Sequence, residues 1–272
     1  MTEATKRGDG RNLARLVEVM AELRSEQGCP WDREQTHQSL KPYVIEEAYE
    51  VLEAVDSGSP NKLREELGDL LLQVVFHAQL GAEAGTFTMD DVIETIVAKL
   101  IRRHPHVFAA TKVDGVAGVL DNWERIKKSE MPNERPSAID GVPKDLPALM
   151  KAEKIQNKAA KVGFDWDDLG GPLQKVKEEF REFEEALNEA GAPDKASPGW
   201  DRMEDEFGDI LFALVNVGRF LEIQPEQALR RTITKFSDRF RYMEARVKEQ
   251  GRNLKEMTLA EMDELWEEAK RR

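Results

Sequence analysis

The two halves of the chain carry the same short motifs in the same order. Each half has a Trp-Asp pair, a glutamate cluster EExxExxE, a Glu-x-x-Asp pair, a Lys-x-x-x-Arg pair and a Trp-Glu-x-x-Lys segment. In the first half these motifs begin at Trp31, Glu46, Glu66, Lys99 and Trp123, and in the second half at Trp166, Glu178, Glu206, Lys235 and Trp266. Five landmarks in one order are unlikely to arise by chance, so the chain is predicted to contain two copies of one structural unit.

Most segments between these motifs have the periodicity of amphipathic helices. Apolar residues recur every three or four positions from Leu13 to Leu23, which places them on one helical face. Helix starts are indicated by Ser59-Pro60, by Thr88 with Asp91, and by Thr258 with Glu261, where a side chain can accept hydrogen bonds from free backbone N–H groups. No alternating strand pattern competes, so we expect an all-α fold of two tandem helical bundles.

The domain boundaries follow from proline content. Residues 131–147 hold four of the twelve prolines, which cannot share a helix because each lacks an N–H donor. This segment is predicted to link an N-terminal domain, 1–130, to a C-terminal domain, 148–272. The second copy is longer in residues 188–202, where glycine and proline indicate an extended loop.

Charge and cysteine content exclude several classes of protein. Fifty-three acidic residues against 40 basic ones give a net charge of −13, which disfavours nucleic acid as the main partner. The single cysteine, Cys29, cannot form an internal disulfide or a thiolate zinc cluster. Neither an export signal in Met1–Asn12 nor a membrane-spanning apolar run is visible. We therefore expect a cytoplasmic protein without a membrane partner.

The acidic motifs predict a metal site in each copy. Glutamates three apart lie on one helical face, and a short loop makes consecutive helices antiparallel neighbours, so four carboxylates could converge in each bundle. The predicted ligands are Glu47, Glu50, Glu66 and Asp69 in the first copy and Glu179, Glu182, Glu206 and Asp209 in the second. Oxygen ligands suit Mg²⁺, with Mn²⁺ as an alternative.

A solvated acidic face is the alternative for a chain this rich in charge. The helices that carry Asp69 and Asp209 argue against it, because mainly apolar residues follow each aspartate and indicate burial on most faces. Buried carboxylates need a countercharge. Each helix also has a polar stripe typical of a cavity wall, formed by Glu66, Asp69, Gln73 and His77 in one and by Glu206, Asp209 and Asn216 in the other.

Other metals and ligands can be compared on spacing. A di-iron site needs two Glu-x-x-His pairs, and the sequence has one, Glu34 with His37, outside both acidic clusters. Lys99 with Arg103 and Lys235 with Arg239 lie one helical turn apart and could hold phosphate oxygens, although such pairs are equally typical of a plain surface. A non-catalytic helical interaction protein with acidic metal-binding clusters remains the alternative function.

The duplicated acidic motifs, with Cys29-Pro30-Trp31-Asp32 and Gly163-Phe164-Asp165-Trp166, resemble the MazG nucleoside triphosphate pyrophosphohydrolases from about Leu13 to Arg271. The resemblance implies an all-α homodimer with sites near the subunit contacts. It also implies Mg²⁺-dependent hydrolysis of a nucleoside triphosphate to the monophosphate and diphosphate, in nucleotide-pool housecleaning. Spacing alone does not distinguish attack at the α-phosphorus from attack at the γ-phosphorus.

The resemblance also assigns residue roles. It places metal ligands at Glu179, Glu182, Glu206 and Asp209, with matching positions at Glu47, Glu50, Glu66 and Asp69, and nucleotide contacts at Lys175, Lys235, Arg239, Trp266, Lys99, Arg103 and Trp123. The first copy has Tyr43 where the second has Lys175, so the second copy is the favoured catalytic one. Glu178, Glu179 and Glu182 are the predicted catalytic residues, with Glu178 or Glu185 as the general base.

Overall fold

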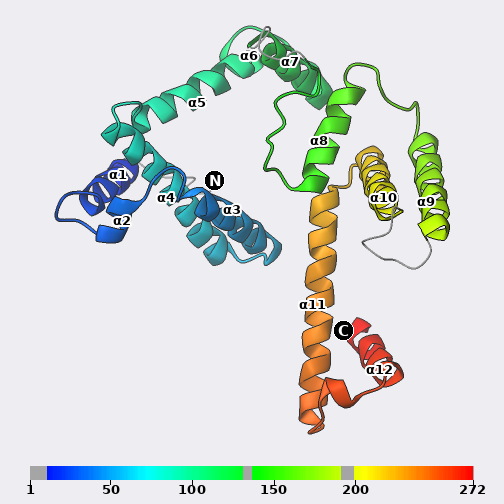
Figure 1. The fold of residues 1–272 in the computed structure, drawn as a ribbon. Helices are drawn as coiled ribbons and strands as arrows, with labels where there is room; N and C mark the ends of the chain where they lie inside the picture. The colour runs from blue at the N-terminus through cyan, green and yellow to red at the C-terminus, as the bar shows by residue number, and fades with distance from the viewer. Residues whose placement is uncertain (1–10, 131–136, 191–198, 272) are drawn as a thin grey trace, which may run out of the picture. The chain divides into compact units, whose positions relative to one another are not determined.

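The computed structural model describes residues 11–130, 137–190 and 199–271, and all regular secondary structure in them is helical (Figure 1). This confirms the predicted all-α class. The chain separates into an N-terminal unit, residues 1–130, and a C-terminal unit, residues 131–272. The described part of the predicted linker, residues 137–147, contains no helix, and residues 131–136 lie outside the described part.

The N-terminal unit is built around the pair of helices α3 and α4. Its helices are α1 (Arg11–Leu23), α2 (Pro30–Glu34), α3 (Lys41–Asp56), α4 (Pro60–Glu83), α5 (Met89–Arg103), α6 (Pro105–Phe108) and α7 (Gly115–Glu130). The loop between α3 and α4 is short, so the two helices pack as antiparallel neighbours. Met20 of α1 and Leu40 pack with Val75 and Phe76 of α4 in the main core cluster.

The C-terminal unit repeats this pair as α9 and α10. Its helices are α8 (Ala148–Ala160), α9 (Gly170–Ala190), α10 (Trp200–Phe220), α11 (Pro225–Glu249), the 3-10 helix η1 (Leu254–Glu256) and α12 (Leu259–Lys270). α8 and α9 pack on α10, and α12 packs against α11 through Met243, Val247 and Leu265. The predicted long loop begins within α9 and reaches α10, and its residues 191–198 lie outside the described part.

The predicted helix starts are confirmed. Ser59 accepts a hydrogen bond from the backbone N–H of Lys62 at the start of α4. Thr88 with Asp91 and Thr258 with Glu261 form reciprocal capping boxes at the starts of α5 and α12. These contacts satisfy backbone donors that the first helical turn leaves without partners. Among the described helices, none is both long enough and apolar enough to cross a membrane.

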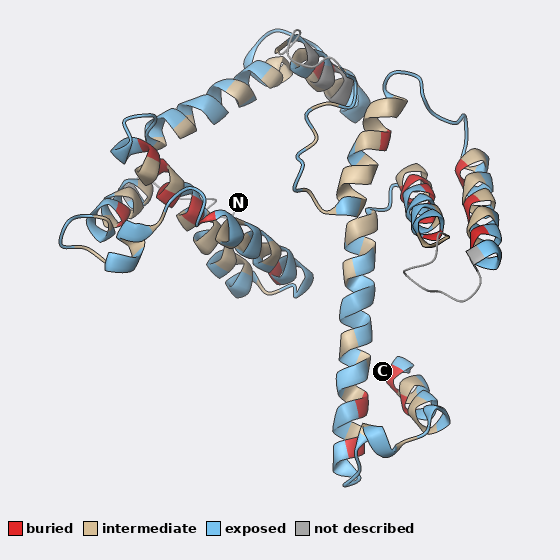
Figure 2. Ribbon diagram, viewed as in Figure 1, coloured by how far each residue is buried: buried red, intermediate tan, exposed pale blue. Residues whose placement is uncertain are grey.

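The expectation that α4 and α10 are buried on most faces is wrong. Leu67, Leu71 and Val74 of α4 are exposed, as are Phe207 and Leu211 of α10, and α11 is exposed along most of its length (Figure 2). Each helix has one face on its neighbour in the same unit and a second apolar face that the described parts of its unit leave uncovered. The periodicity identified apolar positions correctly, but it does not say what covers them.

Candidate metal site and adjoining cavities

Three carboxylates from two helices meet in each unit. Glu47 of α3 lies with Glu66 and Asp69 of α4, and one oxygen from each lies within 4.8 Å of the others. Glu179 of α9 makes the same group with Glu206 and Asp209 of α10. We call these groups the N-terminal and C-terminal triads. Three convergent carboxylate oxygens are a donor set that fits a hard divalent cation.

Burial and neighbouring like charges act together on the N-terminal triad. The pKa of Glu47 is raised, first by burial and then by the charges of Asp69 and Glu50. The pKa of Glu66 is also raised, by burial and by the charge of Glu50. Glu50 therefore lies close enough to act on both carboxyls, and it hydrogen-bonds Glu47, although it is outside the triad. A bound cation would relieve this repulsion.

A lysine provides the countercharge in the C-terminal triad. Glu179 is only 5% exposed, and the Nζ atom of Lys175 lies 2.7 Å from its Oε1 atom and 2.8 Å from an oxygen of Glu178. These contacts raise the pKa of Lys175 and lower that of Glu178. In the N-terminal unit, Tyr43 instead packs on the core cluster and against Trp31.

The other predicted glutamates of α9 lie beside arginine and outside the triad. Glu182 is half-buried, with an oxygen 3.9 Å from the guanidinium of Arg181. Glu185 is exposed, and its carboxylate lies 3.7 Å from Arg181. The geometry thus brings together three of the four predicted ligands in each unit.

A cavity adjoins the C-terminal triad. Its volume is about 440 Å³, and Glu179, Asp209 and Lys175 line it together with apolar and amide side chains from α8 and α10. Asn216 of the predicted polar stripe also lines it. A ligand held at the triad by an anionic group would therefore have space for an organic part beside it.

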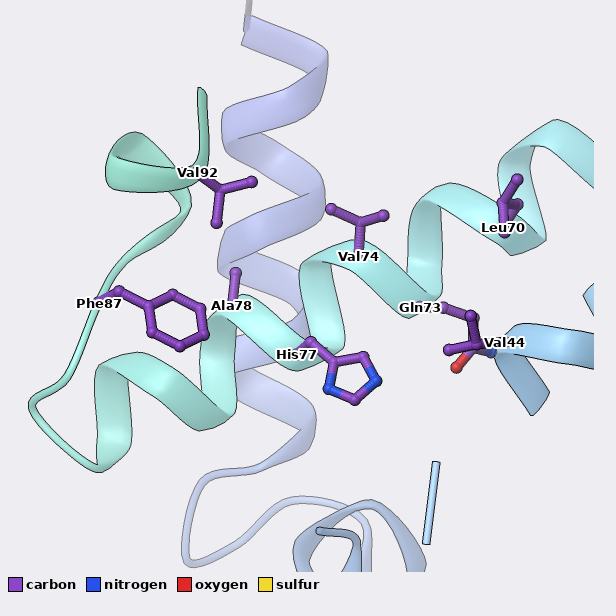
Figure 3. Close-up of a pocket in the computed structure, with 8 residues that line it drawn as sticks. All are labelled: Val44, Leu70, Gln73, Val74, His77, Ala78, Phe87 and Val92. Atoms are coloured by element: carbon purple, nitrogen blue, oxygen red, sulfur yellow. The ribbon is translucent and has the colours of Figure 1, made fainter. Parts of the chain in front are cut away.

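The N-terminal unit has a smaller cavity, of about 270 Å³, on α4 (Figure 3). Its wall is apolar except for Gln73 and His77, both from the predicted polar stripe. The Nδ1 atom of His77 lies 2.8 Å from Nδ1 of His37, and burial and His37 lower the pKa of His77. The two histidines therefore bond each other, and the metal-ligand groups found among the described residues contain no histidine.

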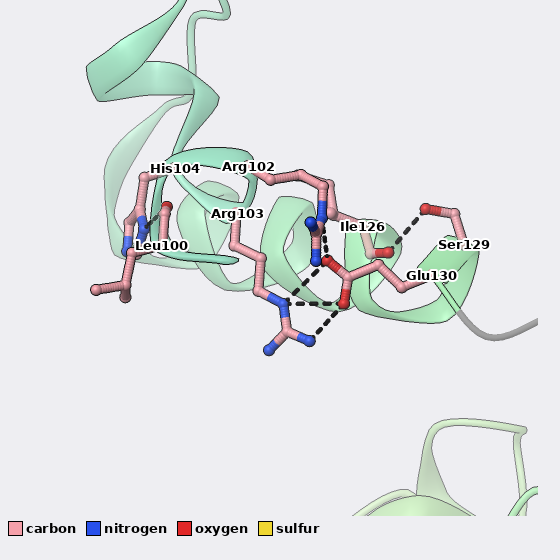
Figure 4. Close-up of polar contacts among 7 residues, drawn as sticks. All are labelled: Leu100, Arg102, Arg103, His104, Ile126, Ser129 and Glu130. Carbon is pink, nitrogen blue, oxygen red and sulfur yellow. Dashed lines mark hydrogen bonds and ion pairs between the residues drawn. The ribbon is translucent and has the colours of Figure 1, made fainter. Parts of the chain in front are cut away.

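The predicted phosphate contact of the N-terminal unit is engaged by an acidic side chain. Arg102 and Arg103 both bond the carboxylate of Glu130, whose oxygens lie 2.7 Å from Nε of Arg102 and 3.2 Å from Nε of Arg103 (Figure 4). The guanidinium of Arg103 also lies 5.3 Å from the ring centre of Trp123. Lys99, one turn earlier on α5, is half-buried.

The corresponding residues of the C-terminal unit lie on α11 and α12. The guanidinium of Arg239 is 5.7 Å from the ring centre of Trp266, and Lys235 is exposed. None of these three side chains is among the described residues that line the cavity at the C-terminal triad. A single chain therefore does not place the predicted nucleotide contacts of α11 and α12 around that cavity.

The Glu130 ion pair predicts a pH-dependent change in stability. The two arginines lower the pKa of Glu130 from its ordinary 4.5 to about 2, so the ionised carboxylate stabilises the folded state above pH 4.5 and this contribution is lost as the pH falls toward 2. Glu130→Gln should lower the free energy of unfolding at pH 7, with a smaller difference from wild type at pH 3. Urea unfolding at both values tests this, and an equal difference at both would contradict it.

The polar stripe predicted Asn216 at a cavity wall, but neither Gln156, which also lines the C-terminal cavity, nor the ion pair behind Asn216 was predicted from the sequence. Asp165 accepts from Arg219 across 54 positions of sequence, and Arg219 donates to Asn216. Gln156 of α8 donates to the backbone carbonyl of Phe212. The sequence shows the motif that contains Asp165, and it shows a polar residue at position 216. No local pattern in the sequence indicates that Arg219 connects the two.

Comparisons with known proteins cover nearly the whole chain. Residues 35–108 match the MazG nucleotide pyrophosphohydrolase domain. The chain is 47% identical to the nucleoside triphosphate pyrophosphohydrolase/pyrophosphatase MazG of Thermotoga maritima, over 94% of both chains. It is 45% identical to the Escherichia coli K12 nucleoside triphosphate pyrophosphohydrolase, over 95% of this chain and 97% of that protein.

A third relative is longer. The chain is 54% identical to the uncharacterized protein YabN of Bacillus subtilis over 93% of its own length and 50% of that protein. Identity at this level over almost the full length of the first two relatives decides the family. The chain belongs to the MazG nucleoside triphosphate pyrophosphohydrolases.

Proposed function

We propose that this protein hydrolyses nucleoside triphosphates to the monophosphate and diphosphate, with Mg²⁺ as cofactor and with the C-terminal triad as the main site. The observation that carries the proposal is that triad, because two of its three carboxylates, Glu179 and Asp209, line one cavity together with Lys175. The full-length relatives named as nucleoside triphosphate pyrophosphohydrolases support it. Housecleaning of the nucleotide pool in the cytoplasm is the role that we propose with it.

Glu179, Glu206 and Asp209 would hold the cation, and Glu182 on the next turn of α9 would complete the set. An all-carboxylate site favours Mg²⁺, or Mn²⁺ in its place, over a di-iron centre, which needs histidine ligands. A cation held there would neutralise charge that develops during attack at phosphorus. The same roles fall on Glu47, Glu50, Glu66 and Asp69 in the N-terminal unit.

Lys175 would bind the triphosphate. Its ammonium group bonds Glu178 and Glu179 in the chain alone, and it would turn from them toward a phosphate oxygen of the substrate. That movement would raise the pKa of Glu178, which Lys175 now lowers, and make Glu178 a better base. Glu178 would take a proton from the attacking water while the water oxygen bonds the α-phosphorus. The bond from the α-phosphorus to the oxygen that bridges it to the β-phosphorus would break, and diphosphate would leave.

We further propose a homodimer. Leu229, Ile233, Phe236 and Phe240 form an exposed apolar stripe along α11, with spacings of four, three and four residues. A second copy covering this stripe would bury it and could bring Lys235, Arg239 and Trp266 to a cavity on the partner chain. The site would then be complete only in the dimer.

Product analysis tests the proposed reaction. Purified protein is incubated with ATP, GTP, CTP or UTP and Mg²⁺, and the nucleotides are separated by ion-exchange chromatography. We expect monophosphate with diphosphate, and no turnover in EDTA. Nucleoside diphosphate with phosphate would show that the γ-phosphate is cleaved instead, and it would contradict the proposed reaction. Absence of turnover, together with a melting temperature unaffected by Mg²⁺, would favour a non-catalytic helical interaction protein.

A further inference from the structure

A buried amide at the C-terminal cavity lacks one hydrogen-bond partner. Gln156 is 7% exposed and lines the cavity, and its Nε2 atom donates to the backbone carbonyl of Phe212 at 2.8 Å. That bond fixes which end of the amide is the donor, so Oε1 is the acceptor. Oε1 is buried and has no hydrogen-bond partner in the part of the chain that the structure describes. A buried acceptor without a partner is unfavourable, so a ligand donor would stabilise it.

A second buried amide in the same wall is fixed in the opposite sense. Asn216, also 7% exposed, accepts from Nε of Arg219 through its Oδ1 atom at 2.8 Å. Arg219 is held in turn by both carboxylate oxygens of Asp165, one of them at 3.0 Å. With its oxygen engaged by Arg219, Asn216 has its amide N–H groups to offer to a ligand in the cavity.

Both amides are located at one turn of α10. Within a helix, the carbonyl of Phe212 is the acceptor for the backbone N–H of Asn216, four residues later. Gln156 bonds that same carbonyl from α8, which places its amide beside position 216. The wall thus presents an acceptor and a donor close together, as the edge of a nucleobase does.

Aromatic side chains complete the cavity. Phe164 and Trp166 line it, and both are exposed to solvent, Phe164 more than Trp166. The Trp166 ring packs directly over Gly171, where an added Cβ would lie 2.1 Å from Cδ1 of the ring. Glycine at this position therefore lets the ring approach the start of α9, at the wall of the cavity. Flat aromatic faces of this kind stack on nucleobases.

We propose that this cavity binds the nucleobase of the substrate and selects adenine and cytosine, in which an exocyclic amino group on the Watson–Crick edge lies beside an unprotonated ring nitrogen. The inference rests on the proposed function, which fixes the phosphates at the C-terminal triad. Adenine and cytosine offer an amino N–H to Oε1 of Gln156 and a ring nitrogen to the N–H groups of Asn216. Hypoxanthine and uracil present a carbonyl oxygen and a ring N–H at those places, which leaves both amides facing like groups.

Two matched pairs of substrates test the selection. ITP differs from ATP, and UTP from CTP, by replacement of the amino group with a carbonyl oxygen. We expect kcat/KM to be at least ~10-fold higher for ATP than for ITP and for CTP than for UTP, because a site built to hydrogen-bond a group rejects the analogue that lacks it. Ratios near one, or reversed ratios, with turnover intact would overturn the selection and leave the proposed function standing.

Three variants assign the effect to the two amides. Gln156→Met keeps the size of the side chain and removes the acceptor, so both ratios should fall toward one. Asn216→Asp replaces the donor with an acceptor and should raise turnover of ITP relative to ATP. Gln73→Met is the matched control, because Gln73 is also a 7% exposed glutamine with an unpartnered Oε1 atom, in the N-terminal cavity. This control should keep the wild-type ratios.

Further readouts separate folding and the proposed function from base selection. Circular dichroism melts identify any variant that fails to fold. If either Gln156→Met or Asn216→Asp does not fold, the other of these two variants tests the base selection. If the wild-type protein hydrolyses no triphosphate, the proposed function fails, and calorimetric titration with AMP and IMP decides the base selection alone. Tighter binding of AMP would support it, and equal binding or tighter binding of IMP would overturn it.

Discussion

Glu179→Gln is expected to lower kcat/KM for nucleoside triphosphate hydrolysis by at least ~100-fold, whereas Glu47→Gln keeps most of the activity. Glutamine matches glutamate in size but has no negative charge. At position 179 it removes one buried carboxylate from the C-terminal triad and one partner of Lys175. Replacing residues that only orient metal ligands already costs 10- to 100-fold, and Glu179 is placed to bind the cation directly.

The contrast with Glu47 depends on differences between the two copies. The N-terminal triad has the same geometry, but Tyr43 stands in place of Lys175 and Glu130 engages Arg103. Steady-state rates with ATP and Mg²⁺ measure both variants, and circular dichroism confirms that both are folded. Equal losses in the two variants would mean that the copies cooperate, and loss in Glu47→Gln alone would assign the chemistry to the N-terminal unit.

Ile233→Glu is expected to convert the protein to a monomer and to lower its activity by at least ~10-fold. Ile233 is 56% exposed in the middle of the apolar stripe on α11. In a dimer formed through this stripe, the change would bury an unpaired carboxylate, at a cost of several kcal/mol. Activity should fall with the dimer because Lys235, Arg239 and Trp266 lie on α11 and α12, outside the cavity of their own chain.

Sedimentation velocity and the steady-state rate are measured together for this variant. Thr234→Glu is the control, since it adds the same charge on the neighbouring position of α11, about 100° around the helix from Ile233. It should leave both the dimer and the rate unchanged. A monomeric but fully active Ile233→Glu variant would show that one chain forms a complete site, and a dimeric variant would place the contact elsewhere.

Local patterns predicted much of the fold. The capping residues Ser59, Thr88 and Thr258 begin helices as expected, because a cap depends only on neighbours in sequence. The pairing of α3 with α4 and of α9 with α10 followed from short-range periodicity and the repeat. The burial of α4 and α10 was not predictable in this way, because it depends on what covers their outer apolar faces.

Spacing also predicted the carboxylates that meet, although not their number. A separation of three residues places Glu47 and Glu50 on one face, but the position of α4 decides which oxygens reach Glu66 and Asp69. The partners of the arginines were likewise set by tertiary structure. Glu130 lies 27 residues from Arg103, and Asp165 lies 54 residues from Arg219, so no local pattern connects them.

The domain boundaries and the roles of the site residues stay predictions. The N-terminal unit ends at residue 130, directly before the predicted linker, 131–147. The first six residues of that linker lie outside the described part. Expression of residues 1–130 and 148–272 as separate chains would show whether each folds alone.

Direct measurement of divalent cation binding tests the central claim, that the C-terminal triad is a metal site. Mn²⁺ is titrated into the metal-free protein, and free Mn²⁺ is followed by electron paramagnetic resonance, first for the wild type and then for the Glu179→Gln and Glu206→Gln variants. We predict that the wild type binds Mn²⁺, that Mg²⁺ displaces it, and that both variants lose a class of sites. Wild-type protein that binds no Mn²⁺, or variants that bind as the wild type does, would contradict the account.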